Sequence, residues 1–205
     1  MNNIASTVSF QKSARSLASC ILIAATAILA VQPARADWGD GVANCGVQIV
    51  STLVPSLCLS YADTVDRSSA LLRPCSGTIN QSWNVRLADD GGIFLESAQA
   101  AERVLEVADG STTSGGRVQF WGLNVPWLRR TQQWNIVPAR LRATTFQDFA
   151  VNILNENSRF CLDIQWGNAV EGTPVWQWPC NGGDAQTWRL IVTNPDCSGV
   201  SHVLP

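Results

Sequence analysis

The sequence has 205 residues, with 14 basic and 16 acidic side chains and a formal net charge of −2. A weakly acidic chain does not favour binding to nucleic acid or to an anionic membrane surface, so we expect neither as a partner. The length fits a leader segment followed by one domain with its own hydrophobic core.

The first 36 residues have the pattern of a secretory signal peptide. Lys12 and Arg15 lie in a polar lead, residues 17–31 form an uncharged apolar run, and Ala-Arg-Ala at 34–36 is a typical cleavage site. The run is shorter than the roughly 20 residues that span a membrane. We therefore expect cleavage before Asp37 and a secreted protein, extracellular or periplasmic, without membrane insertion.

Cleavage would leave residues 37–205 as one domain. Three of the 14 basic residues fall in the leader, which leaves 11 against 16 acidic residues. Leu-Ala-Ser-Cys at 17–20 is similar to a lipoprotein acylation box, but such a cysteine normally follows the apolar run, and Cys20 precedes most of it. Simple cleavage is the favoured interpretation.

Short apolar runs separated by turns rich in Gly, Ser and Asn predict an all-β fold. The runs divide into three units, about 44–88, 89–140 and 141–193. No stretch outside the leader shows helical periodicity. In chain order, the expected strands are 47–51, 58–59, 70–73 and 81–83, then 92–96, 104–107, 117–121 and 132–134, then 151–154, 161–164, 174–178 and 186–188.

A Gln-x-Trp triplet closes each unit, and the three tryptophans are 51 and 54 positions apart. This near-equal spacing indicates an internal repeat. One unit cannot bury its own apolar face, whereas three units around a pseudo-threefold axis can share one core. The triplet residues with an expected structural role are Gln81, Trp83, Gln132, Trp134, Gln186 and Trp188.

Six cysteines remain after removal of Cys20, and an even number in an exported chain predicts three disulfides. Six cysteines allow 15 connectivities. Pairing within a unit is the economical choice, because two pairs lie just before their own Gln-x-Trp triplet. The expected disulfides are Cys58–Cys75, Cys161–Cys180 and, between the two ends of the domain, Cys45–Cys197.

The third unit carries a specific combination of motifs. These are Cys-Leu-Asp at 161–163, Gly-Thr-Pro-Val at 172–175, Trp-Pro-Cys-Asn-Gly-Gly at 178–183 and Gln-Thr-Trp at 186–188. In these residues the chain resembles the ricin-type (ricin B chain-like) β-trefoil lectin domain family. The resemblance covers essentially all of residues 37–205. It implies an all-β, β-trefoil fold with three Gln-x-Trp repeats, in which the Gln and Trp side chains are mainly architectural.

The resemblance also implies shallow sugar sites, one in each unit. An Asp after the Cys-Leu pair and a Gln and an Asn further on bind sugar hydroxyls, and an aromatic side chain stacks on the apolar face of the ring. In the third unit Trp176 stands in place of the Gln and Ala185 in place of the Asn. The candidate carbohydrate-binding residues of this unit are Asp163, Trp176, Gln177, Trp178 and Asn181.

The other two units match this pattern less well. The second offers Glu106 in place of the Asp, together with Gln119 and Trp121, and lacks the two cysteines. The first has Ser60 for the Asp and Arg73 for the aromatic residue, so we expect it to complete the fold without binding sugar.

We expect no enzymatic activity, no cofactor and no metal. His202 is the only histidine and lies close to the C-terminus, which argues against a His-based triad or a His-ligated metal. The motifs of nucleotide-binding loops and of the serine hydrolase elbow are absent from the sequence.

The leading hypothesis is a secreted lectin that binds galactose-type or related glycans through the third unit and, in addition, the second. The alternative is a non-catalytic cell-binding subunit of a multi-component toxin, as in cytolethal distending toxins, with other toxin subunits as partners. An inhibitor or structural trefoil without sugar binding is a third possibility.

Overall fold

The computed structural model describes residues 45–88, 92–139 and 150–193, all within the unit Ala34–Pro205. These residues form twelve strands and short 3-10 turns, without an α-helix. Within the same ranges, no helix is long and apolar enough to cross a membrane. The expected all-β class is confirmed.

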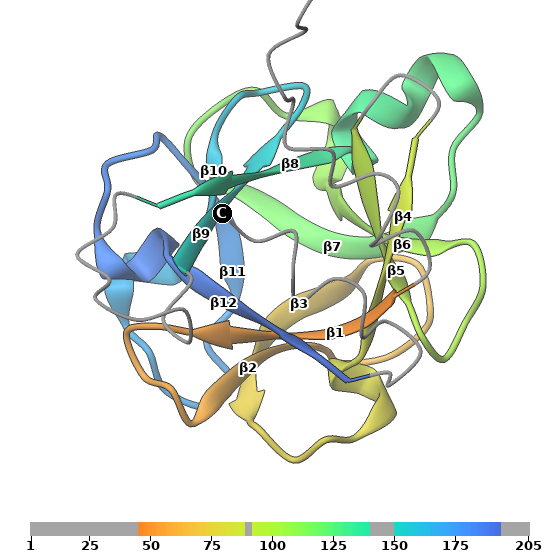
Figure 1. Ribbon diagram of the computed structural model, residues 1–205. Coiled ribbons are helices and arrows are strands. Elements are labelled where there is room, and N and C mark those ends of the chain that lie inside the picture. Colours follow the sequence, from red (N-terminus) through yellow and green to blue (C-terminus); the bar gives the residue numbers. More distant parts are fainter. Residues whose placement is uncertain (1–44, 89–91, 140–149, 194–205) are drawn as a thin grey trace, which may run out of the picture. The chain divides into compact units, whose positions relative to one another are not determined.

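Six antiparallel strands close into a barrel (Figure 1). They are β1 (Cys45–Ser51), β4 (Trp83–Leu87), β5 (Ile93–Ser97), β8 (Trp134–Pro138), β9 (Ala150–Asn155) and β12 (Trp188–Val192). Pairing runs β1–β12–β9–β8–β5–β4 and returns from β4 to β1. Closure leaves no unpaired edge in this ring of strands.

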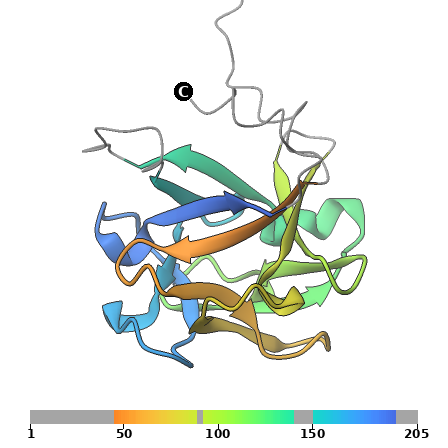
Figure 2. The ribbon, with the colours of Figure 1, turned by 60° about the horizontal axis from the view of Figure 1, so that its bottom comes forward.

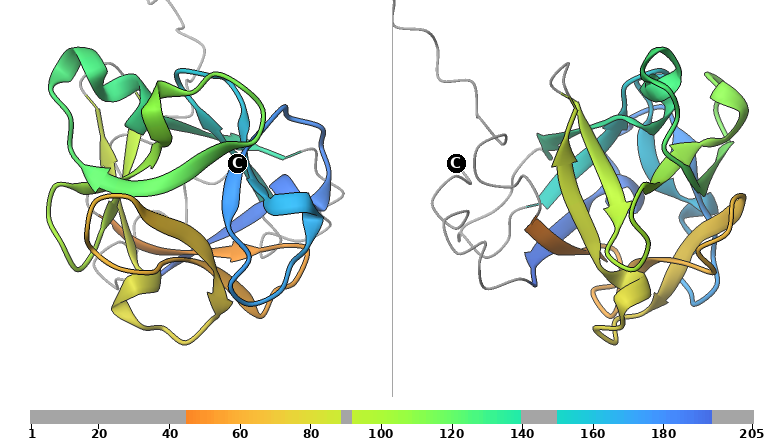
Figure 3. Two further views of the ribbon diagram at one scale, coloured as in Figure 1. Left: turned by 180° about the vertical axis from the view of Figure 1, so that it is seen from behind. Right: turned by 90° about the vertical axis from the view of Figure 1, so that its right-hand side faces the viewer.

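Three hairpins cover one end of the barrel, as Figure 2 shows. They consist of β2 (Leu57–Tyr61) with β3 (Ser68–Pro74), β6 (Arg103–Val107) with β7 (Gly116–Gly122), and β10 (Cys161–Ile164) with β11 (Val175–Trp178). β7 pairs with both β3 and β11, and a bridge between Leu71 and Pro174 joins β3 to the segment before β11. The left view of Figure 3 shows these strands around a common centre. A six-stranded barrel capped by three hairpins is a β-trefoil arrangement.

Three fully buried indoles lie in the core, one at the start of each closing barrel strand. Trp83, Trp134 and Trp188 each have 0% exposure and belong to one hydrophobic cluster. Each indole N–H donates to the carbonyl of a leucine on a hairpin strand: Leu59 at 3.2 Å, Leu105 at 3.0 Å and Leu162 at 3.1 Å. These bonds tie the barrel to the hairpin layer without leaving a buried indole N–H unpaired.

The glutamine of each triplet is buried and holds a loop by the same pair of bonds. Its amide nitrogen donates to a backbone carbonyl, and its amide oxygen accepts from the backbone N–H of the residue two positions after that carbonyl. The carbonyls belong to Pro74, Gly122 and Pro179, and the N–H groups to Ser76, Asn124 and Asn181. Each glutamine ends a 3-10 turn, η1 (Ile79–Gln81), η3 (Pro126–Gln132) or η6 (Asp184–Gln186), so the last strand of each unit begins at the tryptophan rather than at the glutamine.

Two of the three expected disulfides are present, Cys58–Cys75 and Cys161–Cys180. The third involves Cys197, which lies outside the described residues. In the second unit, buried Val104 packs in a small apolar cluster with Ala88, Phe94 and Leu123. Apolar packing therefore occupies the place that a disulfide holds in the other two units.

Candidate functional site

The carboxylate of Asp163 lies on β10, directly opposite Trp176 on β11. The indole N–H of Trp176 donates to Asp163 Oδ1 at 2.7 Å, and the two residues are only 5% and 8% exposed. The sequence predicted that Trp176 would stand where a glutamine binds sugar. In the structure, however, the indole N–H of Trp176 is hydrogen-bonded to the aspartate, so Trp176 holds the carboxylate in place.

Burial raises the pKa of Asp163, while hydrogen bonds from Trp176 and from the Gln-x-Trp glutamine Gln186 oppose the shift. A carboxylate has about four acceptor positions on its two oxygens. Two protein donors therefore leave this group with capacity to accept hydrogen bonds from a ligand.

An indole cluster, which we define as Trp166, Trp176 and Trp178, lies beside this carboxylate and contacts it through Trp176. Trp176 and Trp178 are stacked, with ring centroids 4.9 Å apart and an interplanar angle of 17°. Trp166 meets Trp176 edge-on at 4.7 Å and lies 6.5 Å from Trp178. One ring face of Trp178 is therefore covered by Trp176, and a ligand stacking on this cluster must use the faces that remain.

Gln177 requires a correction, because its side chain does not reach the surface. The residue is 0% exposed, and its amide nitrogen donates to the carbonyls of Ser111 at 2.8 Å and Thr113 at 2.9 Å. Its amide oxygen accepts from the Ser158 hydroxyl at 2.6 Å. Side chains alternate along a strand, so Gln177 points away from Trp176 and Trp178 and fastens β11 to a turn of the second unit.

Asn181 follows the second cysteine of the third unit and is exposed. Its side-chain oxygen accepts from the backbone N–H of Gly183 at 2.8 Å, and its own N–H donates to Gln186. Asn181 thus shapes the loop that leads to the Gln-x-Trp triplet, and its side chain remains at the surface.

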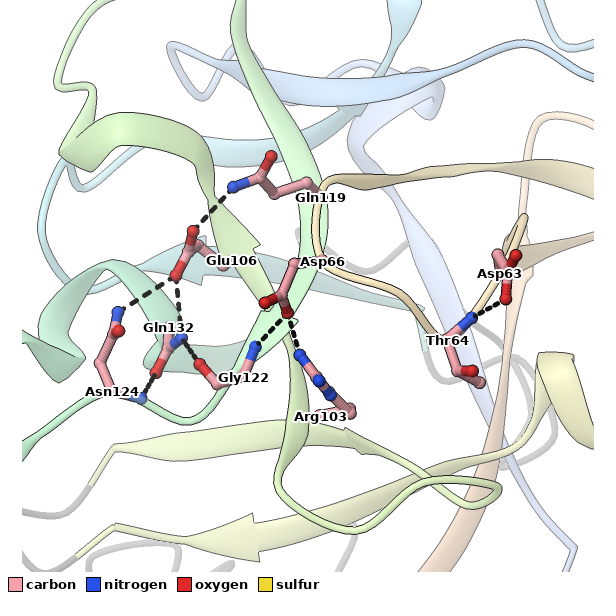
Figure 4. Close-up of polar contacts among 9 residues, drawn as sticks. All are labelled: Asp63, Thr64, Asp66, Arg103, Glu106, Gln119, Gly122, Asn124 and Gln132. Carbon is pink, nitrogen blue, oxygen red and sulfur yellow. Dashed lines mark hydrogen bonds and ion pairs between the residues drawn. The ribbon is translucent and has the colours of Figure 1, made fainter.

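In the second unit, Glu106 lies at the centre of a buried hydrogen-bond network (Figure 4). Oε1 accepts from Gln119 Nε2 at 2.8 Å, and Oε2 accepts from Gln132 Nε2 at 2.8 Å and from Asn124 Nδ2 at 3.2 Å. The residue is 5% exposed. Three protein donors fill most of the roughly four acceptor positions of this carboxylate, which leaves it less capacity for sugar hydroxyls than Asp163 has.

Burial raises the pKa of Glu106, and the hydrogen bonds from Gln119, Gln132 and Asn124 oppose this shift. The expected platform of this site, Trp121, is also engaged, since the guanidinium of Arg67 lies 5.7 Å from its ring centroid. The second unit therefore uses its sugar-site positions for internal contacts.

The first unit has no carboxylate at the corresponding position. The Ser60 hydroxyl donates to the Asn80 carbonyl at 3.2 Å, and Arg73 forms an exposed ion pair with Glu171 at 3.1 Å. Asp66 accepts from the backbone N–H of Gly122 at 3.0 Å and pairs with Arg103, which joins this unit to the second (Figure 4). These contacts are structural.

Residues 130–200 match a family model described as ricin-type beta-trefoil lectin domain-like. The resemblance to the ricin-type β-trefoil lectin family is confirmed. A designed threefold-symmetric protein, ThreeFoil, has 24% identity and a TM-score of 0.63, covering 72% of this chain and 99% of that one. The Macrolepiota procera ricin B-like lectin, solved with lactose, has 22% identity and a TM-score of 0.57, covering 74% and 97%.

A mosquitocidal holotoxin also matches this chain, with 17% identity and a TM-score of 0.63. The match covers 74% of this chain and 17% of the holotoxin. At such identities these structures show a shared fold and nothing further. No match was found among curated proteins.

Among the sequence-predicted residues, the structure brings together Asp163, Trp176 and Trp178. It also brings in Trp166, which was not among the predicted site residues. The sequence did carry a signal for it, because Trp166, Trp176 and Trp178 lie close together in the third unit. Within the described ranges, no three His, Cys, Asp or Glu side chains converge as a metal site.

Proposed function

We propose that this chain is a non-catalytic carbohydrate-binding protein, a lectin for galactose-type or related glycans, and that its third unit binds the sugar. The observation that carries the proposal is the indole cluster beside Asp163, a carboxylate with acceptor capacity left. A sugar has polar hydroxyl edges and an apolar C–H face. A carboxylate and an indole in contact can bind both.

The same proposal assigns the second unit a structural role. In the second unit, Glu106 accepts three protein hydrogen bonds, and the guanidinium of Arg67 lies over the ring of Trp121. In the third unit, Asp163 accepts two protein hydrogen bonds, and Trp166 is exposed to solvent. Displacing a buried donor leaves it unpaired, which costs about 1–3 kcal/mol. Sugar binding is therefore favoured in the third unit.

We further propose that the three units are repeats around a pseudo-threefold axis and that the mature protein is secreted after cleavage before Asp37. The three matching indole bonds and the three matching glutamine bonds support the repeat. The signal-like pattern of the leader and the two disulfides support export, because disulfides persist in oxidising compartments.

A glycan array followed by calorimetry tests the lectin proposal. Asp163→Asn and Trp178→Ala should each weaken binding at least tenfold, while the matched second-unit change Trp121→Ala should leave affinity within twofold. Circular dichroism and thermal unfolding verify that each variant is folded. A wild-type protein that binds no glycan, or a Trp121→Ala variant as impaired as Trp178→Ala, contradicts the assignment.

The second candidate function is a non-catalytic cell-binding subunit of a multi-component toxin. The fold match to one part of a mosquitocidal holotoxin favours it, because a domain of this kind is there joined to a toxin. The test is genetic and biochemical: a toxin-like gene next to this one, whose product co-purifies with this chain, would support the subunit function.

A further inference from the structure

Trp166 is the most exposed of the large hydrophobic side chains in the described residues, at 77%. The other members of that exposed group are aliphatic: Leu53, Val65, Ile79, Val125, Val170, Ile191 and Val192. An indole in this position leaves a large apolar surface in water, which is unfavourable unless something covers it.

The backbone of Trp166 is also in an unusual conformation. Its φ is 59° and its ψ is 13°, in the left-handed region. Gly, Asn and Asp adopt this region readily, whereas for a bulky side chain it is a true outlier. The equivalent residue of the second unit, Asp109, has φ 56° and ψ 21° and is one of the residue types that suit this position.

The ring is held in place although it is exposed. Trp166 contacts Trp176 edge-on at 4.7 Å, and Trp176 is itself bonded to Asp163 and stacked on Trp178. The loop is fixed on both sides by backbone bonds, from Gln165 to Pro174 at 3.2 Å and from Gly172 to Leu72 at 2.8 Å. A strained, exposed and positioned aromatic ring points to a function in binding.

We propose that Trp166 is a stacking platform for a second sugar ring, so that the third unit binds an oligosaccharide rather than a single sugar. This inference rests on the lectin function proposed above. The Asp163 carboxylate holds the terminal sugar through hydrogen bonds. The adjacent sugar lies on Trp166, whose ring centroid is 6.5 Å from that of Trp178.

Trp166→Gly tests the proposal with a matched control, Asp109→Gly. Glycine accepts a positive φ without strain, so both variants should be at least as stable as the wild type. Calorimetry compares galactose with lactose, N-acetylglucosamine with chitobiose, and glucose with cellobiose. In the pair that the wild type binds best, Trp166→Gly should lower affinity for the disaccharide roughly five- to tenfold more than it lowers affinity for the monosaccharide. Asp109→Gly should change neither.

The outcomes separate this inference from the lectin proposal. If the wild type binds a disaccharide and Trp166→Gly binds it equally well, the platform is overturned and the lectin function stands. If the wild type binds no saccharide in any pair, both are overturned. If sedimentation shows a wild-type dimer that Trp166→Gly dissociates, the ring belongs to a protein interface and the platform is again overturned.

Discussion

At the scale of single residues, the acidic side chains of the two candidate sites differ in length by one methylene group. Glu106 and Asp163 occupy equivalent strand positions, yet the longer side chain has Gln119, Gln132 and Asn124 as donors, whereas Asp163 has the indole N–H of Trp176 and the amide of Gln186. The sequence predicted that both carboxylates bind sugar. Residue type alone does not show which hydrogen-bond donors surround an acidic side chain, so the difference between the two sites could not be predicted. The sequence also could not show that Trp176 would donate to Asp163.

Replacing Glu106 with glutamine should preserve the fold. The Gln119 side-chain oxygen is buried without a hydrogen-bond partner among the described residues, so rotating that amide lets it accept from the new N–H group. The new carbonyl can still accept from Gln132 and Asn124. We expect Glu106→Gln to change the free energy of unfolding by less than about 1 kcal/mol, and Glu106→Ala to cost about 2–4 kcal/mol, because the alanine removes the acceptor of three side-chain hydrogen bonds. Urea denaturation of both variants measures this, and equal losses would contradict the network.

The same residue predicts how stability depends on pH. Burial raises the pKa of Glu106 above its ordinary value of 4.5, so the folded protein keeps a proton that the unfolded chain has already lost. This contribution is complete below the unfolded pKa and disappears as pH rises through the folded pKa, and Asp163 acts with the same sign. In thermal unfolding followed across this range, Glu106→Gln should lose part of the decline in stability with rising pH, and the double variant with Asp163→Asn should lose more. An unchanged pH profile would contradict the raised pKa.

At the scale of elements, the strand pattern was predictable and the contacts between units were not. The predicted strand 161–164 coincides with β10, whereas β2 extends to Tyr61, beyond the predicted 58–59. Tyr61 is buried against Trp83 and is stacked on Phe120 of the second unit at 4.6 Å, a contact between units that no local pattern shows. The same applies to Gln177. Strand alternation places its side chain on the other face of β11 from that of Trp176, but only the fold shows that a turn of the second unit covers it.

The two disulfides should stabilise the hairpin layer to a similar extent. They close loops of 17 and 19 residues, for which the chain-entropy model gives about 3 kcal/mol each. Changing both cysteines of either pair to serine should therefore lower the free energy of unfolding by about 2–4 kcal/mol without changing the fold, because the second unit builds its hairpin without a disulfide. Denaturant unfolding of the two double variants tests this. Loss of all structure in one of them would mean that the hairpins cannot form by packing alone.

At the scale of the whole molecule, three equivalent indoles join the barrel to the hairpins. Their spacing in the sequence predicted a shared core, and the structure places all three in one cluster with matching bonds to leucine carbonyls. The direction of those bonds was not predictable, because it depends on which hairpin strand lies over each barrel strand.

Replacing any one of these indoles with phenylalanine should cost about 2–4 kcal/mol, through the unpaired leucine carbonyl and the space left by the smaller ring. Because the three indoles pack in one core, each variant of Trp83, Trp134 and Trp188 should still unfold in a single transition. Calorimetry and intrinsic fluorescence should report the same midpoint. Separate transitions would show that the units unfold independently and would contradict a shared core.

The central claim is that the third unit binds carbohydrate through its indole cluster, and the nine tryptophans allow it to be tested in one titration. Protein labelled with ¹⁵N at the indole nitrogens is titrated with a galactose-terminated oligosaccharide and followed by NMR. The account predicts that the indole signals of Trp166, Trp176 and Trp178 shift with one binding curve, while those of Trp83, Trp134 and Trp188 stay unchanged. Shifts confined to Trp121, or no shift at millimolar sugar, would contradict it.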